Sequence, residues 1–237
     1  MKKINLLAIG VLLIVILPGC EKLVGKGPVV TENRTISPFQ GLTLGVPANA
    51  YFTQAPDYSI ELRAQQNILD EIETVIVNDE LKIRFRHPGT SVRTHEEITV
   101  YVRAPEIRNL EVDGSGNLNV SPLTSSALRL FISGSGSMHA DNIEASTIDA
   151  SISGSGTMKV NEGNANSETV NISGSAVIDL GGVMVKDADT HISGSGVIKV
   201  NASKTLTAHL SGSGTVFYYG TPSVSTSISG SGSVVKL

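Results

Sequence analysis

The sequence predicts an all-β protein built as a β-solenoid, in its simplest form a parallel β-helix with coils of about 18–20 residues. Three observations lead to this fold class: a Gly-Ser phrase recurs at near-constant spacing, apolar and polar residues alternate around it, and the composition suits a packed core. Of 237 residues, 40% are hydrophobic and 24 are glycine, and the formal net charge is −4. This profile is not that of a disordered chain, and its acidic balance argues against nucleic acid as the main partner.

The repeated phrase is ISGSG or a close variant of it. Its first glycine falls at positions 114, 134, 154, 174, 194, 212 and 230, so the intervals are 20 residues four times and then 18 twice. A flexible linker lacks ordered apolar residues, whereas Leu130, Ile132, Met138 and Ala140 share one parity around one copy. A period of two indicates strands with one buried face. The repeat therefore predicts stacked strands, with an antiparallel meander or a β-prism as the alternative.

One unit has too few apolar residues to bury a face alone, so the copies must stack, at about 4.8 Å per coil. Glycine would either bend the chain at a corner or leave room where no side chain fits. Stacking aligns the serines in two columns, which would either hydrogen-bond along the stack or form a flat face that binds a carbohydrate or another repetitive surface. The candidate binding residues are Ser133, Ser135, Ser153, Ser155, Ser193, Ser195, Ser211 and Ser213. Ala176, which replaces a glycine, and the two 18-residue intervals predict local changes of coil shape.

The first residues indicate export. Lys2 and Lys3 precede the apolar run Leu6–Leu17, and Cys20 follows shortly after it, in an order that resembles a bacterial lipoprotein signal. We therefore expect a signal peptide over residues 1–19 and a lipid on Cys20, with an uncleaved anchoring helix as the alternative. Cys20 is the only cysteine, which excludes an internal disulfide. Residues 20–28 would then be a flexible tether between the lipid and the folded region.

Residues 29–110 form a different strand-rich region, which turn signals divide into short segments. Because Leu110 and Val112 already follow the alternation of the repeat, this region and the repeat region, residues 111–237, are expected to share one core. The arginines are interleaved with acidic residues, which indicates a solvated surface more than an anion-binding patch. A short helical turn is expected at Asn67–Glu73, and the expected strands are Val29–Arg34, Gly41–Val46, Ala50–Gln54, Ser59–Ala64, Thr74–Val77, Glu80–Arg86 and Glu97–Arg103.

No motif indicates catalysis, a metal or a cofactor, and we expect none of the three. The chain has no HExxH, GxGxxG, Walker or GxSxG pattern. We interpret His139, His191 and His209 as lying at different positions of their copies, which argues against a stacked column of metal ligands. The aspartates of the repeat are scattered over expected turns. A β-helix enzyme that degrades polysaccharides is therefore kept only as an alternative.

The signal, the strand-rich opening and the ISGSG repeats together resemble a family of exported Gram-negative proteins, the putative auto-transporter adhesins with the head GIN domain. The resemblance covers about Val29–Leu237. It implies a β-helical or related all-β fold at the cell envelope and brings no defined binding or catalytic residues. We expect an outer-membrane lipoprotein that acts as an adhesin or a surface-binding scaffold, with a self-associating structural protein as a further alternative. Its expected partners are the membrane, through the lipid, a carbohydrate or protein surface, and, in the last alternative, a second copy of the chain.

Overall fold

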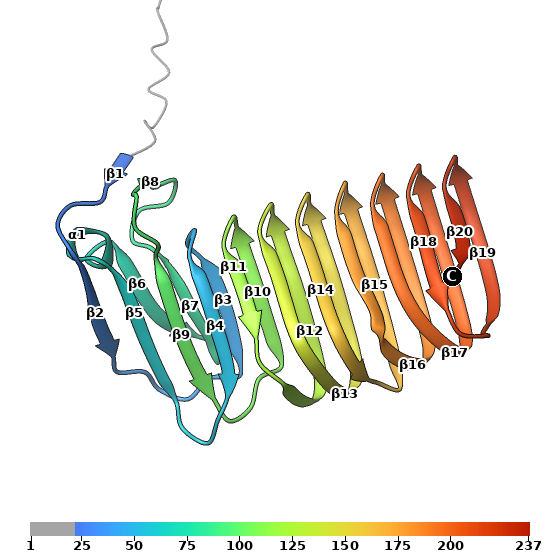
Figure 1. Ribbon diagram of the computed structural model, residues 1–237, viewed down its shortest axis with the longest axis horizontal. Helices are drawn as coiled ribbons and strands as arrows, with labels where there is room; N and C mark the ends of the chain where they lie inside the picture. Colours follow the sequence, from blue (N-terminus) through green and yellow to red (C-terminus); the bar gives the residue numbers. More distant parts are fainter. Residues whose placement is uncertain (1–21) are drawn as a thin grey trace, which may run out of the picture.

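A computed structural model of the chain describes residues 22–237 and shows a β-solenoid of about 6 turns (Figure 1). The predicted fold class is confirmed. The predicted signal peptide and Cys20 lie outside the described residues. Within them, no helix has the length and apolar character needed to cross a membrane.

The N-terminal region contains short strands and one helical turn. Its strands agree with those expected from the sequence within a few residues, and a short strand at residues 91–93 is added to them. The elements are β1 (Lys22–Val24), β2 (Val29–Arg34), β3 (Gly41–Gly45), β4 (Asn49–Gln54), β5 (Ser59–Gln65), α1 (Gln66–Leu69), β6 (Ile72–Val77), β7 (Glu80–Phe85), β8 (Ser91–Arg93) and β9 (Thr99–Ala104).

The repeat region consists of parallel strands, several of which bend around a corner and so serve both sheets of the solenoid. Its strands are β10 (Asn109–Gly114), β11 (Asn117–Val120), β12 (Leu123–Gly134), β13 (Ser137–Gly154), β14 (Thr157–Asn164), β15 (Ser167–Gly174), β16 (Val177–Gly194), β17 (Val197–Gly212), β18 (Thr215–Tyr219), β19 (Ser223–Gly230) and β20 (Ser233–Lys236).

The register of the sheets repeats the spacing of the phrase. Ile132 pairs with Ile152, which pairs with Ile172, and the same column continues through Ile192 and Leu210. Every pairing between strands of the repeat is parallel, as a β-helix requires and as an antiparallel meander would not allow. The alternating apolar residues point inward and form one core with those of the N-terminal region.

The Gly-Ser-Gly turns stack backbone directly on backbone. The first glycine of each of the seven turns has a φ between 112° and 127°, which L-residues rarely adopt. A Cβ added at Gly194 would also lie closer to the Gly174 carbonyl oxygen than real Cβ contacts allow. The Gly194 carbonyl in turn accepts a hydrogen bond of 2.9 Å from the N–H of Ser213 in the next coil. Glycine therefore acts in both expected ways, since it turns the corner and lets the coils approach.

The two expected irregularities have different outcomes. Ala176 keeps the hydrogen bonds of the turn, because its carbonyl still accepts from the N–H of Val197 at 2.9 Å. The change to an 18-residue interval does alter the coil: the register between β16 and β17 shifts between Asp179 and Met184 and again before Asp187. These shifts lie at the corner opposite the glycine turn. The coil is therefore shortened by two residues at that corner, and the serine columns stay in register.

The first coil is one that the repeat phrase does not mark. Strands β3 and β4 pair in parallel with β10 and β11, and the corner between them is Val46-Pro47-Ala48 in place of Gly-Ser-Gly. On the other side, β7 and β9 pair in parallel with β3 and β4. Strand β5 pairs antiparallel to both β2 and β9, and β6 pairs antiparallel to β7. Together with α1 these strands form the N-terminal end of the solenoid in Figure 1.

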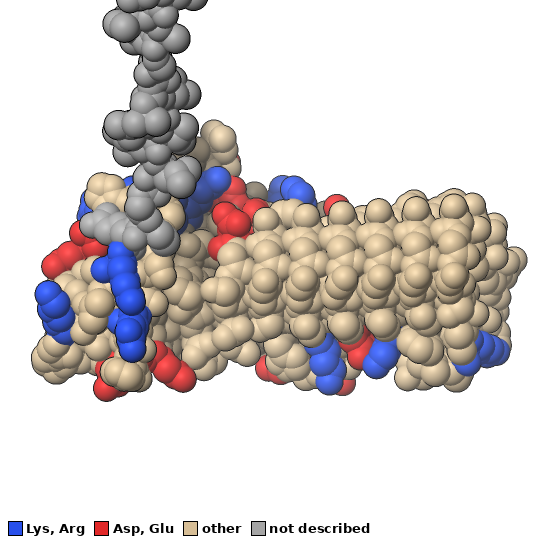
Figure 2. Space-filling view, turned by 90° about the horizontal axis from the view of Figure 1, so that it is seen from above, with Lys and Arg blue, Asp and Glu red and all other residues tan. Residues whose placement is uncertain are grey.

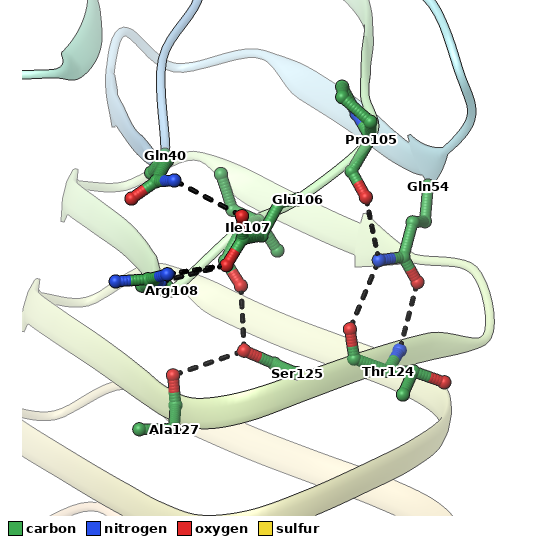
Figure 3. Close-up of polar contacts among 9 residues, drawn as sticks. All are labelled: Gln40, Gln54, Pro105, Glu106, Ile107, Arg108, Thr124, Ser125 and Ala127. Carbon is green, nitrogen blue, oxygen red and sulfur yellow. Dashed lines mark hydrogen bonds and ion pairs between the residues drawn. The ribbon is translucent and has the colours of Figure 1, made fainter.

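Side-chain amides and a hydroxyl join the first coils to the segment that follows β9 (Figure 3). Gln54 donates to the carbonyls of Pro105 and Thr124, both at 3.0 Å, and accepts from the Thr124 N–H at 2.9 Å. The buried Ser125 hydroxyl donates to the Ile107 carbonyl at 2.9 Å. These contacts satisfy backbone groups where regular strand pairing stops.

The expected tether is not free of structure over its whole length. Lys22–Val24 forms β1, which pairs in parallel with β8. The Gly25 N–H then donates to the Arg93 carbonyl at 3.0 Å, and the Lys26 N–H donates to Asn67 Oδ1 at 2.9 Å. Residues 22–26 therefore pack along the N-terminal region.

One core column contains a carboxyl group. Glu168 pairs with Ile148 and Ala188, which are core residues of the neighbouring coils, and it is 2% exposed. Neither of its carboxyl oxygens has a hydrogen-bond partner among the described residues. Burial raises the pKa of Glu168 well above its ordinary value, because removal from water disfavours the charged carboxylate relative to the neutral acid.

We expect Gly194→Ala to lower the free energy of unfolding by about 1–3 kcal/mol through its backbone conformation alone, with the contact against Gly174 adding to this loss. Chemical denaturation of the full-length chain in detergent micelles, followed by circular dichroism, measures the change. Ser195→Ala is the matched control, because Ser195 is exposed in the same turn and its loss should change stability by no more than about 0.5 kcal/mol. Equal stability of the two variants would contradict the role of the glycine.

We expect Glu168→Leu to stabilise the fold by roughly 1–3 kcal/mol, since it removes a buried polar group without a partner. The wild-type chain should lose stability as pH rises above about 4.5, the ordinary pKa of this side chain, because the unfolded chain releases the proton there and the folded chain retains it. The loss continues until the pH reaches the raised pKa of the folded state. Denaturation midpoints measured between pH 4 and 8 test this.

Glu168→Gln separates the two effects of that substitution. It keeps a polar side chain of similar size but cannot ionise, so this part of the pH dependence should disappear without the gain in stability at acidic pH. An unchanged pH dependence in Glu168→Gln would show that another group is responsible.

Candidate functional site

The two predicted columns of serines lie on the outside of the solenoid. Ser153, Ser173, Ser193, Ser211 and Ser229 are paired in register in one sheet and are all exposed. Ser133, at the start of this column, is half-buried. The second column lies in the turns themselves, where Ser135, Ser155, Ser175, Ser195, Ser213 and Ser231 are exposed. All eight serines singled out in the sequence belong to these two columns.

A groove with a volume of about 540 Å³ runs beside the first column. One wall is the serine column from Ser153 to Ser229. The other is the neighbouring outward column, two residues earlier on each strand, and it consists of Phe131, Ser151, Asn171, His191, His209 and Ser227. The groove therefore crosses the coils, and Ile152, Ile172, Ile192 and Leu210 also line it, between the two walls.

The hydroxyl groups of the first column are free to bind. Within residues 22–237, none of them forms a side-chain hydrogen bond with another protein group, so the expected hydrogen bonding along the stack is not seen. Each exposed hydroxyl offers one donor and two acceptors. The first column is thus a row of identical polar groups at the spacing of the coils.

The turn side of the solenoid carries no charge along the repeat. Figure 2 looks down on the turns and shows uncharged rows that run to the last coil, with charged side chains along the flanks and in the N-terminal region. No Lys, Arg, Asp or Glu lines the groove. A ligand in the groove would therefore meet hydroxyl, amide, imidazole and apolar groups.

Two aromatic features lie on the outer faces. The Arg129 guanidinium lies 5.3 Å from the centre of the Phe131 ring at one end of the groove, a cation–π contact. On the other sheet, Tyr51 and Tyr101 stack with ring centres 5.3 Å apart and are 41% and 39% exposed. The sequence analysis did not single out this tyrosine pair, whose members lie 50 residues apart and meet only because β4 pairs with β9.

The histidine interpretation was wrong for one pair. His191 and His209 both directly precede the apolar residue that opens the phrase, and the register pairs them on adjacent coils. Their rings stack with centres 4.8 Å apart. His139 does lie elsewhere, on the sheet that begins with β11. The change of interval from 20 to 18 residues concealed the match, because a fixed period of 20 does not align the two histidines.

The charged pocket near the N-terminal region differs from the groove in chemistry. It has a volume of about 700 Å³ and its lining includes Lys82, Arg84, Glu111 and Asp113. Burial, together with the charges of Glu80 and Asp113, raises the pKa of Glu111.

Four arginines of the N-terminal region are paired with acids, as the interleaved sequence indicated. Arg34 lies 2.9 Å from Glu32 and Arg84 lies 2.7 Å from Glu73. Arg103 and Arg108 are paired in the same way, with Asp57 and Glu106. This region is therefore a solvated surface with mixed charge.

The solenoid and its exposed columns define a class of protein that presents a long, regular surface rather than an enclosed pocket. Residues 38–222 match the family described as putative auto-transporter adhesin, head GIN domain, and the chain belongs to this family. The resemblance predicted from the ISGSG repeats is confirmed. Membership of an adhesin family indicates a protein of the cell surface or envelope.

Solved structures share the fold. A putative adhesin from Bacteroides fragilis has a TM-score of 0.85 at 20% identity, over 91% of this chain and 100% of that one. A putative lipid binding protein from Parabacteroides distasonis has a TM-score of 0.73 at 24% identity, over 92% and 100%. A putative adhesin from Parabacteroides merdae has a TM-score of 0.71 at 21% identity, over 92% and 99%. None of the three is named as an enzyme, and no curated protein matches the chain.

Proposed function

We propose that this chain is a lipid-anchored protein of the outer membrane that binds a carbohydrate surface through the serine-lined groove. The observation that carries the proposal is the row of exposed, unpartnered hydroxyls along a groove that crosses the coils. An extended polysaccharide also presents hydroxyl groups at regular intervals along one axis. Repeated weak hydrogen bonds between the two would add up over several coils, as in multivalent binding.

The chemistry of the groove favours a neutral ligand. The walls contain no Lys, Arg, Asp or Glu side chain that would pair with a charged polymer. Phe131 offers a ring at one end for the apolar face of a sugar, and Asn171 adds an amide to the hydroxyls of the wall. A protein surface with exposed polar groups is the other ligand that fits, and the name of the Parabacteroides distasonis neighbour raises a lipid as a third.

Nothing in the groove favours cleavage of such a polymer. Glycoside hydrolysis uses two carboxyl groups that flank the scissile bond. No carboxylate lines the groove, and Asp149 and Asp179 lie on opposite sheets. Binding without turnover is therefore the activity that we propose.

Self-association is a second candidate, and the last coil favours it. Val224, Ile228 and Val235 of β19 and β20 are 39%, 43% and 39% exposed, whereas their counterparts in earlier coils are buried or half-buried. Within the described chain, β19 pairs only with β17 and β20 only with β18. A second copy could add strands to this edge and leave the groove free.

Variants of the groove test the first candidate. We expect Ser173→Gln combined with Ser193→Gln to weaken binding to a glycan array by at least about tenfold, which is about 1.4 kcal/mol. The longer side chains would fill the groove while the core residues beneath them stay unchanged. Binding is measured with the full-length chain in detergent micelles.

The matched control is Ser175→Gln combined with Ser195→Gln. These serines are exposed in the adjacent column but do not line the groove, so binding should stay within about twofold. An equal loss in both double variants would place the contact on the turns. The absence of any glycan bound by the wild-type chain would reject the proposed ligand.

The anchor is tested separately on Cys20. We expect cells that express the chain to incorporate labelled palmitate into it and to retain it in the outer-membrane fraction, because acyl chains on Cys20 would hold it there. Cys20→Ala should abolish both the label and the membrane retention. Undiminished labelling of Cys20→Ala would refute lipidation at this residue.

A further inference from the structure

Three potential metal ligands meet on the outer face of two adjacent coils. Asp189 and His191 lie two residues apart on β16, so both point outward. His209 lies on β17 and pairs in register with His191. The two imidazole rings are nearly parallel, with an interplanar angle of 25°. The ligand atoms of the three residues all lie within 4.8 Å of one another.

The distances suit one shared ion. Asp189 Oδ1 lies 3.6 Å from His191 Nδ1. Two ligand atoms that each lie about 2.1 Å from one zinc ion at a tetrahedral angle are separated by about 3.4 Å. His209 is exposed, so a rotation of its side chain can bring a ring nitrogen to the same point.

The two atoms on β16 also lack any other partner. Asp189 Oδ1 and His191 Nδ1 are both shielded from solvent, and neither has a hydrogen-bond partner among the described residues. Their separation is too long for a hydrogen bond between them. A shielded acceptor without a partner is costly, and a cation between the two atoms would satisfy both of them.

A second His–Asp pair in the chain lacks these features. His139 Nε2 lies 3.7 Å from Asp141 Oδ1, but it already contacts the Asn161 side-chain amide at 3.1 Å. Its register neighbours are Asn119 and Lys159, so no second imidazole is present and a cationic side chain is adjacent. This pair serves as an internal comparison for the cluster on β16 and β17.

We propose that Asp189, His191 and His209 bind one divalent transition-metal ion, with Zn²⁺ as the probe of choice. Two imidazoles and a carboxylate are the ligand types that suit zinc, copper and nickel, whereas calcium and magnesium prefer oxygen ligands alone. His191 and His209 also line the groove, so positions of the ion not taken by protein would face a ligand there. The metal site does not depend on the proposed carbohydrate binding, and either can fail without the other.

Titration of Zn²⁺ into the untagged full-length chain in detergent micelles, by isothermal calorimetry, tests the site. We expect one ion per chain, with the affinity lowered at least about tenfold in Asp189→Asn and in His209→Gln, because each variant removes one of three ligands. His139→Gln should leave the affinity unchanged. Co²⁺ bound in place of Zn²⁺ should give a visible absorption spectrum that His209→Gln abolishes.

Each other outcome rejects the site. No saturable Zn²⁺ binding would overturn the proposal, and so would equal affinity in the wild-type chain and all three variants. A loss of Zn²⁺ affinity in His139→Gln alone would place the metal site at His139, on the other sheet, and would reject the proposed site. Circular dichroism of each variant checks that the fold is intact, which we expect because the replaced side chains all lie on the outer face.

Discussion

The stacking of backbone on backbone at the Gly-Ser-Gly turn is the contact on which the rest of the molecule depends. From Gly114 to Gly230, the carbonyl oxygen of one glycine lies against the position that a Cβ of the next glycine in the stack would take. The serine that follows this next glycine donates its N–H to the same oxygen. A Cβ at the first glycine would separate the coils at this corner. Because the corner repeats without offset, it sets the register of both sheets, and the register decides which side chains meet.

Fixed register turns each position of the repeat into a column. In the core, the column that contains Ile148 and Leu206 also contains Glu168, whose pKa is raised by burial among these apolar residues. On the surface, the same rule places one serine per coil on the wall of the groove. It also brings His191 against His209, although nothing local to either residue indicates a neighbour. Surface properties in this fold are thus set by which residues occupy equivalent positions, more than by any short motif.

The repeat and its alternation suffice to predict the parallel coils, the inward residues and the two serine columns, because period and parity translate directly into geometry. The first coil could not be found in this way, since its corner is Val46-Pro47-Ala48 and lacks the phrase. Its strands β3 and β4 pair with β10 and β11, which lie more than 60 residues further along the chain. The histidine pair was missed because the interval shortens between its members. The groove depends on side-chain shape across several coils, which alternation does not describe. Cys20 lies outside the described residues and stays a prediction.

Contacts between neighbouring coils also determine which part of the solenoid a bound ligand would stabilise. In a solenoid each coil touches only those beside it, so stability is close to a sum over adjacent pairs. The coil of β3 and β4 has strands on both sides, β7 and β9 on one and β10 and β11 on the other, whereas the last described coil, β19 and β20, has a neighbour on one side only. The groove runs from Phe131 into that coil, at Ser227 and Ser229. A ligand that spans the groove would therefore link the last described coil to the coils before it, so binding would stabilise that end of the stack.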